Sequence, residues 1–143
     1  MTAITGPLLK FTNDDGTPCH GGSGVWPLPT DNGDGTWTPG AWREVDGELE
    51  PCWNGLHVCT ASQAVQHHWL GPAAWLAEVD GEVIAGDDKA TARRARLLRR
   101  LTWDKRAAVL FAADCAERVL SVFESRYPDD LRPRRAIVAA RAW

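Results

Sequence analysis

The sequence predicts an α+β protein, with a small antiparallel β-rich N-terminal region containing one short helix, followed by a C-terminal helical hairpin. All thirteen Gly residues lie at or before Gly86. The charge changes near the same place, since residues 1–88 hold two basic and thirteen acidic side chains while residues 89–143 hold fourteen and six. Toward the C-terminus the apolar residues recur at helical spacing. We therefore expect two domains, residues 1–101 and residues 102–143.

The composition is that of a folded, intracellular protein. Of the 143 residues, 44% are hydrophobic and 24% are charged, and eight Trp residues favour a core pinned by indole rings. The segment Met1–Lys10 has no basic stretch followed by an apolar one, and no apolar run reaches the roughly 18 residues of a membrane span. We therefore expect no secretion and no membrane insertion, and four Cys residues that are reduced or bind metal.

Turn-forming residues separate the expected strands. Leu8–Thr12 has the pattern of a first strand, and residues 17–40 that of a long loop held to the core by Trp26 and Trp37. Two Asp-Gly pairs, at 46–47 and 80–81, each lie between extended segments. They predict two hairpins, because a type I′ turn needs a positive φ at both central positions.

A short helix is expected between these hairpins. Gly55–Cys59 has the pattern of a strand, and Thr60 and Gln63 then form a capping box for a helix that runs to about Trp69. Gly71 and the proline after it end the helix.

The segment 89–101 is compatible with either a strand or a helix, and the segment after it has a clearer helical pattern. Residues 89–101 alternate small and basic residues, which suits an edge strand, but their Ala, Leu and Arg content favours a helix. Thr102 is expected to cap a helix from Trp103 to about Glu124, in which Cys115 packs in the core. Five apolar residues share one face of that helix: Ala108, Phe111, Cys115, Val119 and Val122.

A second C-terminal helix follows a break at Tyr127–Asp130, and Pro133 is tolerated in its first turn. Its amphipathic pattern continues to Trp143, so we expect a protein partner, or self-association through the C-terminal helices, to complete its packing. The binding residues that we predict there are Trp143, Arg134 and Arg141.

The Cys and His residues offer a metal site as an alternative. Cys52, His57, Cys59 and Cys19 supply ligand types of a zinc module, but their spacing is not that of paired Cys-x-x-Cys knuckles. Buried thiols beside a hydrogen-bonded His57 are the interpretation that we favour. Gly21–Gly24 lacks the Lys that a phosphate-binding P-loop requires.

The basic residues after position 88 carry no recognition motif for nucleic acid, which argues against nucleic-acid binding. Internal pairing with the acidic half explains them better.

Two resemblances to known families rest on short motifs. Leu9–Asn13, Pro51-Cys52, Gly55–Cys59 and Trp75–Val79 resemble a domain of unknown function found in phage and actinobacterial proteins, and that resemblance covers roughly the first hundred residues. The tail around Ala112–Leu120, with Arg132-Pro133-Arg134 and the last five residues, resembles the start of a helical family of immunity proteins. The first of these resemblances implies a phage-encoded or phage-like protein in the host cytoplasm.

The run Gly55–Val58, the helix after it and Leu76–Val79 are also similar in order to the elements of ADP-ribosyltransferase folds. That likeness implies NAD in a cleft, with His57 and Glu78 as the catalytic residues. No catalytic Glu stands in a clear motif, however.

Our functional prediction is therefore a non-catalytic interaction protein without a cofactor, which binds a host or virion protein. The alternatives are an ADP-ribosyltransferase-like enzyme at His57 and a small zinc-binding module.

Overall fold

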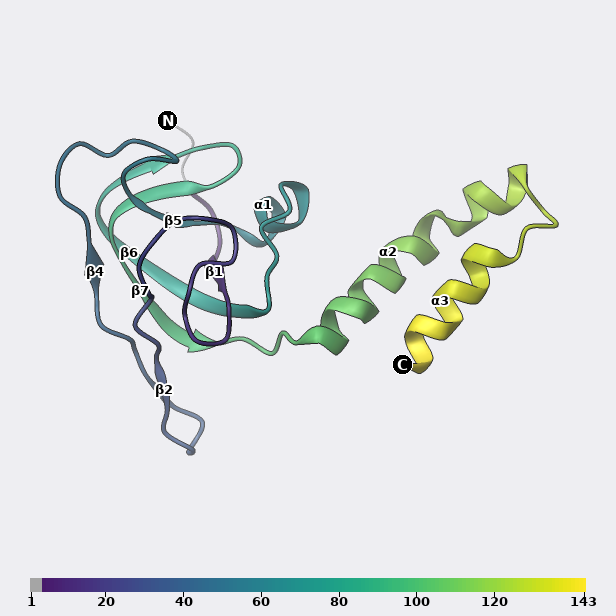
Figure 1. Cartoon of the computed structure of the whole chain (residues 1–143), viewed down its shortest axis with the longest axis horizontal. Helices are drawn as coiled ribbons and strands as arrows, with labels where there is room; N and C mark the ends of the chain where they lie inside the picture. The colour runs from purple at the N-terminus through teal and green to yellow at the C-terminus, as the bar shows by residue number, and fades with distance from the viewer. Residues whose placement is uncertain (1–3) are drawn as a thin grey trace. The chain divides into compact units, whose positions relative to one another are not determined.

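The structure is a computed structural model that describes residues 4–143. Residues 1–3 lie outside the described residues. They belong to Met1–Lys10, the segment in which no export signal is expected. The chain divides into two compact units, Met1–Leu101 and Thr102–Trp143, which we describe one at a time. The first is an antiparallel sheet with long loops and one short helix, and the second is a pair of helices (Figure 1). The α+β class and the C-terminal helical hairpin are thus confirmed.

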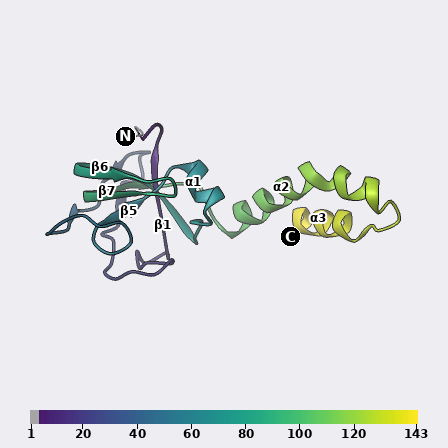
Figure 2. The same cartoon turned by 90° about the horizontal axis from the view of Figure 1, so that it is seen from above.

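A five-stranded antiparallel sheet organises the first unit, with the order β1-β6-β7-β4 and with β5 also paired to β7. Its strands are β1 (Leu8–Thr12), β4 (Arg43–Glu44), β5 (Leu56–Val58), β6 (Ala73–Ala85) and β7 (Ala90–Arg100). Two short strands in the long loop, β2 (Thr30–Asp31) and β3 (Trp37–Thr38), pair with each other. Figure 2 shows β6 and β7 side by side as the long central hairpin.

Two indoles pin the core of the sheet, as the Trp content predicts. Trp26 and Trp75 are each only 3% exposed, and the Trp75 Nε1–H donates to Thr12 Oγ1 at 2.8 Å, so the buried indole is satisfied. Trp37 is half-buried. The loop before β2 is therefore held to the sheet by Trp26.

The segment 89–101, which fits either a strand or a helix, contains strand β7 over residues 90–100. Its small and apolar residues Ala90, Ala92, Ala95 and Leu97 are buried, while four of its five arginines pair with carboxylates. The ion pairs join Arg93 to Glu82, Arg94 to Asp80 and Glu44, Arg96 to Glu78, and Arg100 to Asp14. The basic segment therefore meets the acidic one within the sheet, because Asp80 and Glu78 of β6 stand directly opposite Arg94 and Arg96 of β7.

The hairpin predicted at Asp46-Gly47 is wrong. Arg43 pairs with Ala95 of β7 instead of with the residues after the turn. The Asn54 amide donates to the carbonyls of Asp46 and Glu48, at 2.7 and 2.8 Å, and holds this segment as a loop. Long-range pairing with β7 has overridden the local turn signal.

The hairpin predicted at Asp80-Gly81 is also wrong in its position. β6 continues to Ala85, and the register shifts between Asp80 and Val83, which makes these residues an irregularity inside the strand. Gly81 has a φ of 74°, which suits such a bulge. The chain turns later, where the Gly86 N–H donates to the Lys89 carbonyl.

The first helix, α1 (Ala61–Gln66), carries the predicted capping box. The Thr60 side chain accepts from the Gln63 N–H at 3.2 Å, and the Gln63 side chain accepts from the Thr60 N–H at 3.0 Å. The helix ends earlier than the predicted Trp69, with His67 as its C-cap.

The second unit consists of α2 (Lys105–Arg126) and α3 (Arg132–Ala142). Asp104, not the predicted Thr102, caps α2, since its carboxylate accepts the Ala107 N–H at 2.8 Å. The break before α3 and the place of Pro133 in its first turn agree with the sequence.

Candidate functional site

The two helices of the second unit bury a narrow interface between them. Ala113 and Leu120 of α2 and Ile137 of α3 form its core, and Ala140 packs against them. At 100° per residue, Ala113 and Leu120 lie on the same side of α2. This side faces α3.

An apolar stripe runs along the opposite side of α2. Phe111, Val119 and Val122 are 37%, 61% and 71% exposed, and Cys115 is exposed as well. We call these four side chains the α2 stripe. The prediction that Cys115 packs in the core is therefore wrong, because α3 covers the face that carries Ala113 and Leu120 instead.

Arginine borders the α2 stripe. Helical geometry places Arg118 at one edge, beside Phe111 and Val122. Arg118 is exposed and makes no ion pair with any residue in 4–143. The stripe is thus an apolar surface with a positive charge at its border, which favours a partner with apolar and acidic side chains.

Two of the predicted binding residues hold the hairpin together. Arg134 forms a two-pronged pair with Glu124, at 2.7 and 2.8 Å, and Arg141 pairs with Asp114 at 2.9 Å and with Glu117. Trp143 is 62% exposed, and the Lys105 ammonium lies 4.9 Å from the centroid of its ring. The structure thus shows internal contacts for all three residues.

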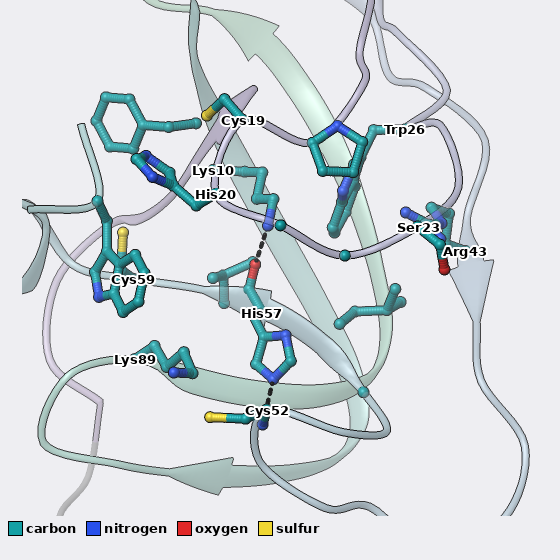
Figure 3. Close-up of a pocket in the computed structure, with 18 of the residues that line it drawn as sticks. Lys10, Cys19, His20, Ser23, Trp26, Arg43, Cys52, His57, Cys59 and Lys89 are labelled. Atoms are coloured by element: carbon teal, nitrogen blue, oxygen red, sulfur yellow. Dashed lines mark hydrogen bonds between the residues drawn. The ribbon is translucent and has the colours of Figure 1, made fainter. Parts of the chain in front are cut away.

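In the first unit, a cavity of about 440 Å³ opens beside β5 (Figure 3). Lys10 from β1, Arg43 from β4 and Lys89 from the turn before β7 all line it. Trp26 lies between Lys10 and Arg43, with the Lys10 Nζ and the Arg43 guanidinium carbon each 5.0 Å from the centroid of its ring. No Asp or Glu of the described chain lines this cavity.

His57 lies in the same cavity. Its Nε2 accepts the Cys52 N–H at 3.1 Å, and its carbonyl accepts from the Lys10 Nζ at 3.0 Å. Burial lowers the pKa of His57, and the charges of Lys10 and Lys89 lower it further. The imidazole is therefore neutral at pH 7, and its Nε2 already accepts a hydrogen bond from the backbone.

The four candidate zinc ligands do not form a metal site. Cys59 Sγ lies 3.8 Å from the Leu9 carbonyl, and burial raises the pKa of its thiol to about 11. The His57 Nε2 is occupied by the Cys52 N–H. Among residues 4–143 no three His, Cys, Asp or Glu side chains gather as a metal ion would require. We therefore do not propose a zinc module on Cys19, Cys52, His57 and Cys59.

The predicted catalytic pair is not brought together. Glu78 of β6 forms an ion pair with Arg96 of β7 at 2.7 Å and does not line the cavity around His57. The structure thus offers no carboxylate partner for an NAD reaction at His57 within the described residues of this cavity.

Sequence reasoning missed the cationic side chains of the cavity. Lys10 and Arg43 are the two basic residues in positions 1–88, and Lys89 is the next along the chain. The signal that could have found Lys10 and Arg43 is their rarity, because the acidic segment 1–88 holds no other Lys or Arg. The convergence of the three cations could not be read from the sequence, because they come from three separate parts of the sheet.

No helix in residues 4–143 is long and apolar enough to cross a membrane.

Comparison with known proteins finds two families. Residues 100–143 match a family described as "Imm-5 like putative immunity protein", which fits an interaction role with a protein partner in general terms. No curated protein and no solved structure matches significantly. Residues 8–108, which are most of the chain, match a second family model. The chain therefore belongs to the family described as "Domain of unknown function (DUF7666)".

Proposed function

We propose that this is a non-catalytic protein-binding protein, and that it binds its partner through the α2 stripe. The observation that carries the proposal is the exposure of Phe111, Cys115, Val119 and Val122 on the side of α2 opposite α3. Four neighbouring apolar side chains on one helical face form a continuous patch, which folded proteins seldom leave uncovered unless it is used for binding.

The class of partner follows from the chemistry of the stripe. An amphipathic helix or a groove of another protein can cover an apolar helical face through positions spaced by three and four residues. The positive charge of Arg118 at its border favours acidic side chains around that partner surface. We therefore propose that the partner is a protein with an apolar patch bordered by Asp or Glu.

The family match supports the place of this surface. It covers residues 100–143, which include both helices, and its description names immunity proteins. We further propose that the chain is phage-encoded or phage-like, that it acts in the host cytoplasm, and that its partner is a host or virion protein. The support for this is the motif resemblance of residues 9–13 and 55–59 to phage and actinobacterial proteins.

The test compares two variants of the full chain. Val119→Asp places a charge in the α2 stripe, and Val65→Asp makes the same change on α1, where Val65 is 44% exposed. Proteins that copurify with each variant are quantified by mass spectrometry, and the candidate partner is then purified and titrated by calorimetry. We expect Val119→Asp to weaken the complex by about thirtyfold or more, as for a residue at the centre of an interface.

Equal weakening by Val65→Asp, or no weakening by Val119→Asp, would contradict the proposal. Loss of a homo-oligomer in Val119→Asp, measured by light scattering, would instead identify a second copy of the chain as the occupant of the stripe.

A further inference from the structure

The cavity of the first unit carries an unbalanced positive charge. Lys10, Arg43 and Lys89 all line it, while no carboxylate of residues 4–143 does. Only Lys89 has a nearby counter-charge, since its Nζ lies 2.9 Å from an oxygen of Asp88. Three cations and one carboxylate leave two positive charges.

Lys10 and Arg43 have room for a further partner. The Lys10 ammonium uses one of its three N–H groups on the His57 carbonyl. Arg43 stacks on Trp26 and forms no ion pair within residues 4–143. Because a guanidinium presents five N–H donors in a planar fork, Arg43 is suited to an oxyanion with several acceptor oxygens.

A glycine loop forms another part of the wall. Gly21, Gly22 and Ser23 line the cavity (Figure 3), and the next residue, Gly24, lies so near Arg43 that a Cβ on it would be 2.7 Å from Arg43 Nη2. Gly21 and Gly22 have φ values of 81° and 97°, and a Cβ at either position would meet nothing within 4 Å. Their backbone is therefore open, which lets a ligand approach the main-chain N–H groups closely.

We propose that this cavity binds a small phosphate-bearing molecule. Two uncompensated charges match a phosphate monoester, which carries between one and two negative charges near pH 7. The glycine loop supplies open backbone, and Lys10 and Arg43 supply the cations whose absence from the loop argued against a P-loop in the sequence.

The size of the cavity indicates that the phosphate is attached to an organic group. A volume of about 440 Å³ lies within the range of small-molecule sites. Trp53, at 84% exposed, also lines the cavity and presents an open indole to the rest of the ligand.

Calorimetric titration of the full chain with AMP, orthophosphate and adenosine tests the proposal. We expect AMP to bind and adenosine not to bind. Arg43→Gln is expected to weaken AMP binding by about tenfold or more, as for loss of a charge-assisted hydrogen bond. Arg43→Lys should restore part of the affinity. Arg135→Gln in the second unit removes the same charge from an exposed site and should leave the affinity unchanged.

A site-specific measurement on the unmodified chain covers the case in which Arg43→Gln does not fold. AMP should shift the NMR amide signals of Gly21, Gly22 and Ser23 before those of the second unit. If orthophosphate binds as tightly as AMP, the natural ligand is free phosphate. If neither binds, or if Arg135→Gln weakens binding as much as Arg43→Gln, the proposal is overturned.

Discussion

Lys10 is the residue whose burial is hardest to explain by stability alone. Burial lowers the pKa of its ammonium to about 8 from 10.5, and the charges of Arg43 and Lys89 add to this effect, while the thiols of Cys19 and Cys59 oppose it. A cation that is held in a cavity without a carboxylate destabilises the folded state. A binding role would account for its place on β1.

Lys10→Met is therefore expected to stabilise the first unit at pH 7 while removing AMP binding. The unbranched Met side chain keeps the packing but removes the buried charge, and we expect a gain of about 1 kcal/mol after allowance for solvent screening. Thermal unfolding and calorimetry measure the two effects. Loss of stability with AMP binding unchanged would contradict this role of Lys10.

The pH dependence of unfolding gives a check with a definite sign. Below pH 8 Lys10 is protonated in both the folded and the unfolded chain, so the buried charge destabilises the folded chain to its full extent. Between about pH 8 and 10.5 only the unfolded chain holds it, and stability should rise with pH. Cys59, whose pKa is raised from 9.0 to about 11, opposes this rise above pH 9. The rise should thus be clearest between pH 8 and 9, and should vanish in Lys10→Met.

Individual elements differ in how far the sequence predicts them. The capping box of Thr60 and Gln63 was predictable, because its contacts lie within four residues. The two Asp-Gly hairpins were not, because β4 pairs with distant residues of β7, and because β6 continues through Gly81 and turns only after Ala85. The N-cap of α2 is Asp104, two residues after the predicted Thr102, because both residue types are favourable N-caps.

Truncation to Ala should destabilise one face of α2 far more than the other. Leu120 is 8% exposed against α3, whereas its neighbour Val119 is 61% exposed in the α2 stripe. Leu120→Ala should destabilise the second unit by about 2–3 kcal/mol, and Val119→Ala should change its stability by no more than about 0.5 kcal/mol. Helical circular dichroism during thermal unfolding measures both. Equal losses would show that the α2 stripe is covered in the free protein.

At the scale of the whole molecule, each of the two units carries a surface that its own folding does not explain. The sheet unit holds a cationic cavity that no carboxylate of residues 4–143 lines. The helical unit leaves the α2 stripe exposed. The sequence predicted the α+β class and the apolar pattern of the stripe. It could not show which face of α2 meets α3, because Ala113 and Leu120 are as compatible with a core as the stripe residues are.

Hydrogen–deuterium exchange of the chain with and without its purified partner tests the central claim most directly. If the α2 stripe is the binding surface, the amides of residues 108–122 gain protection in the complex, and those of β6 and β7 exchange as in the free chain. Protection confined to the first unit, with residues 108–122 unchanged, would contradict the claim that the helical unit binds the partner.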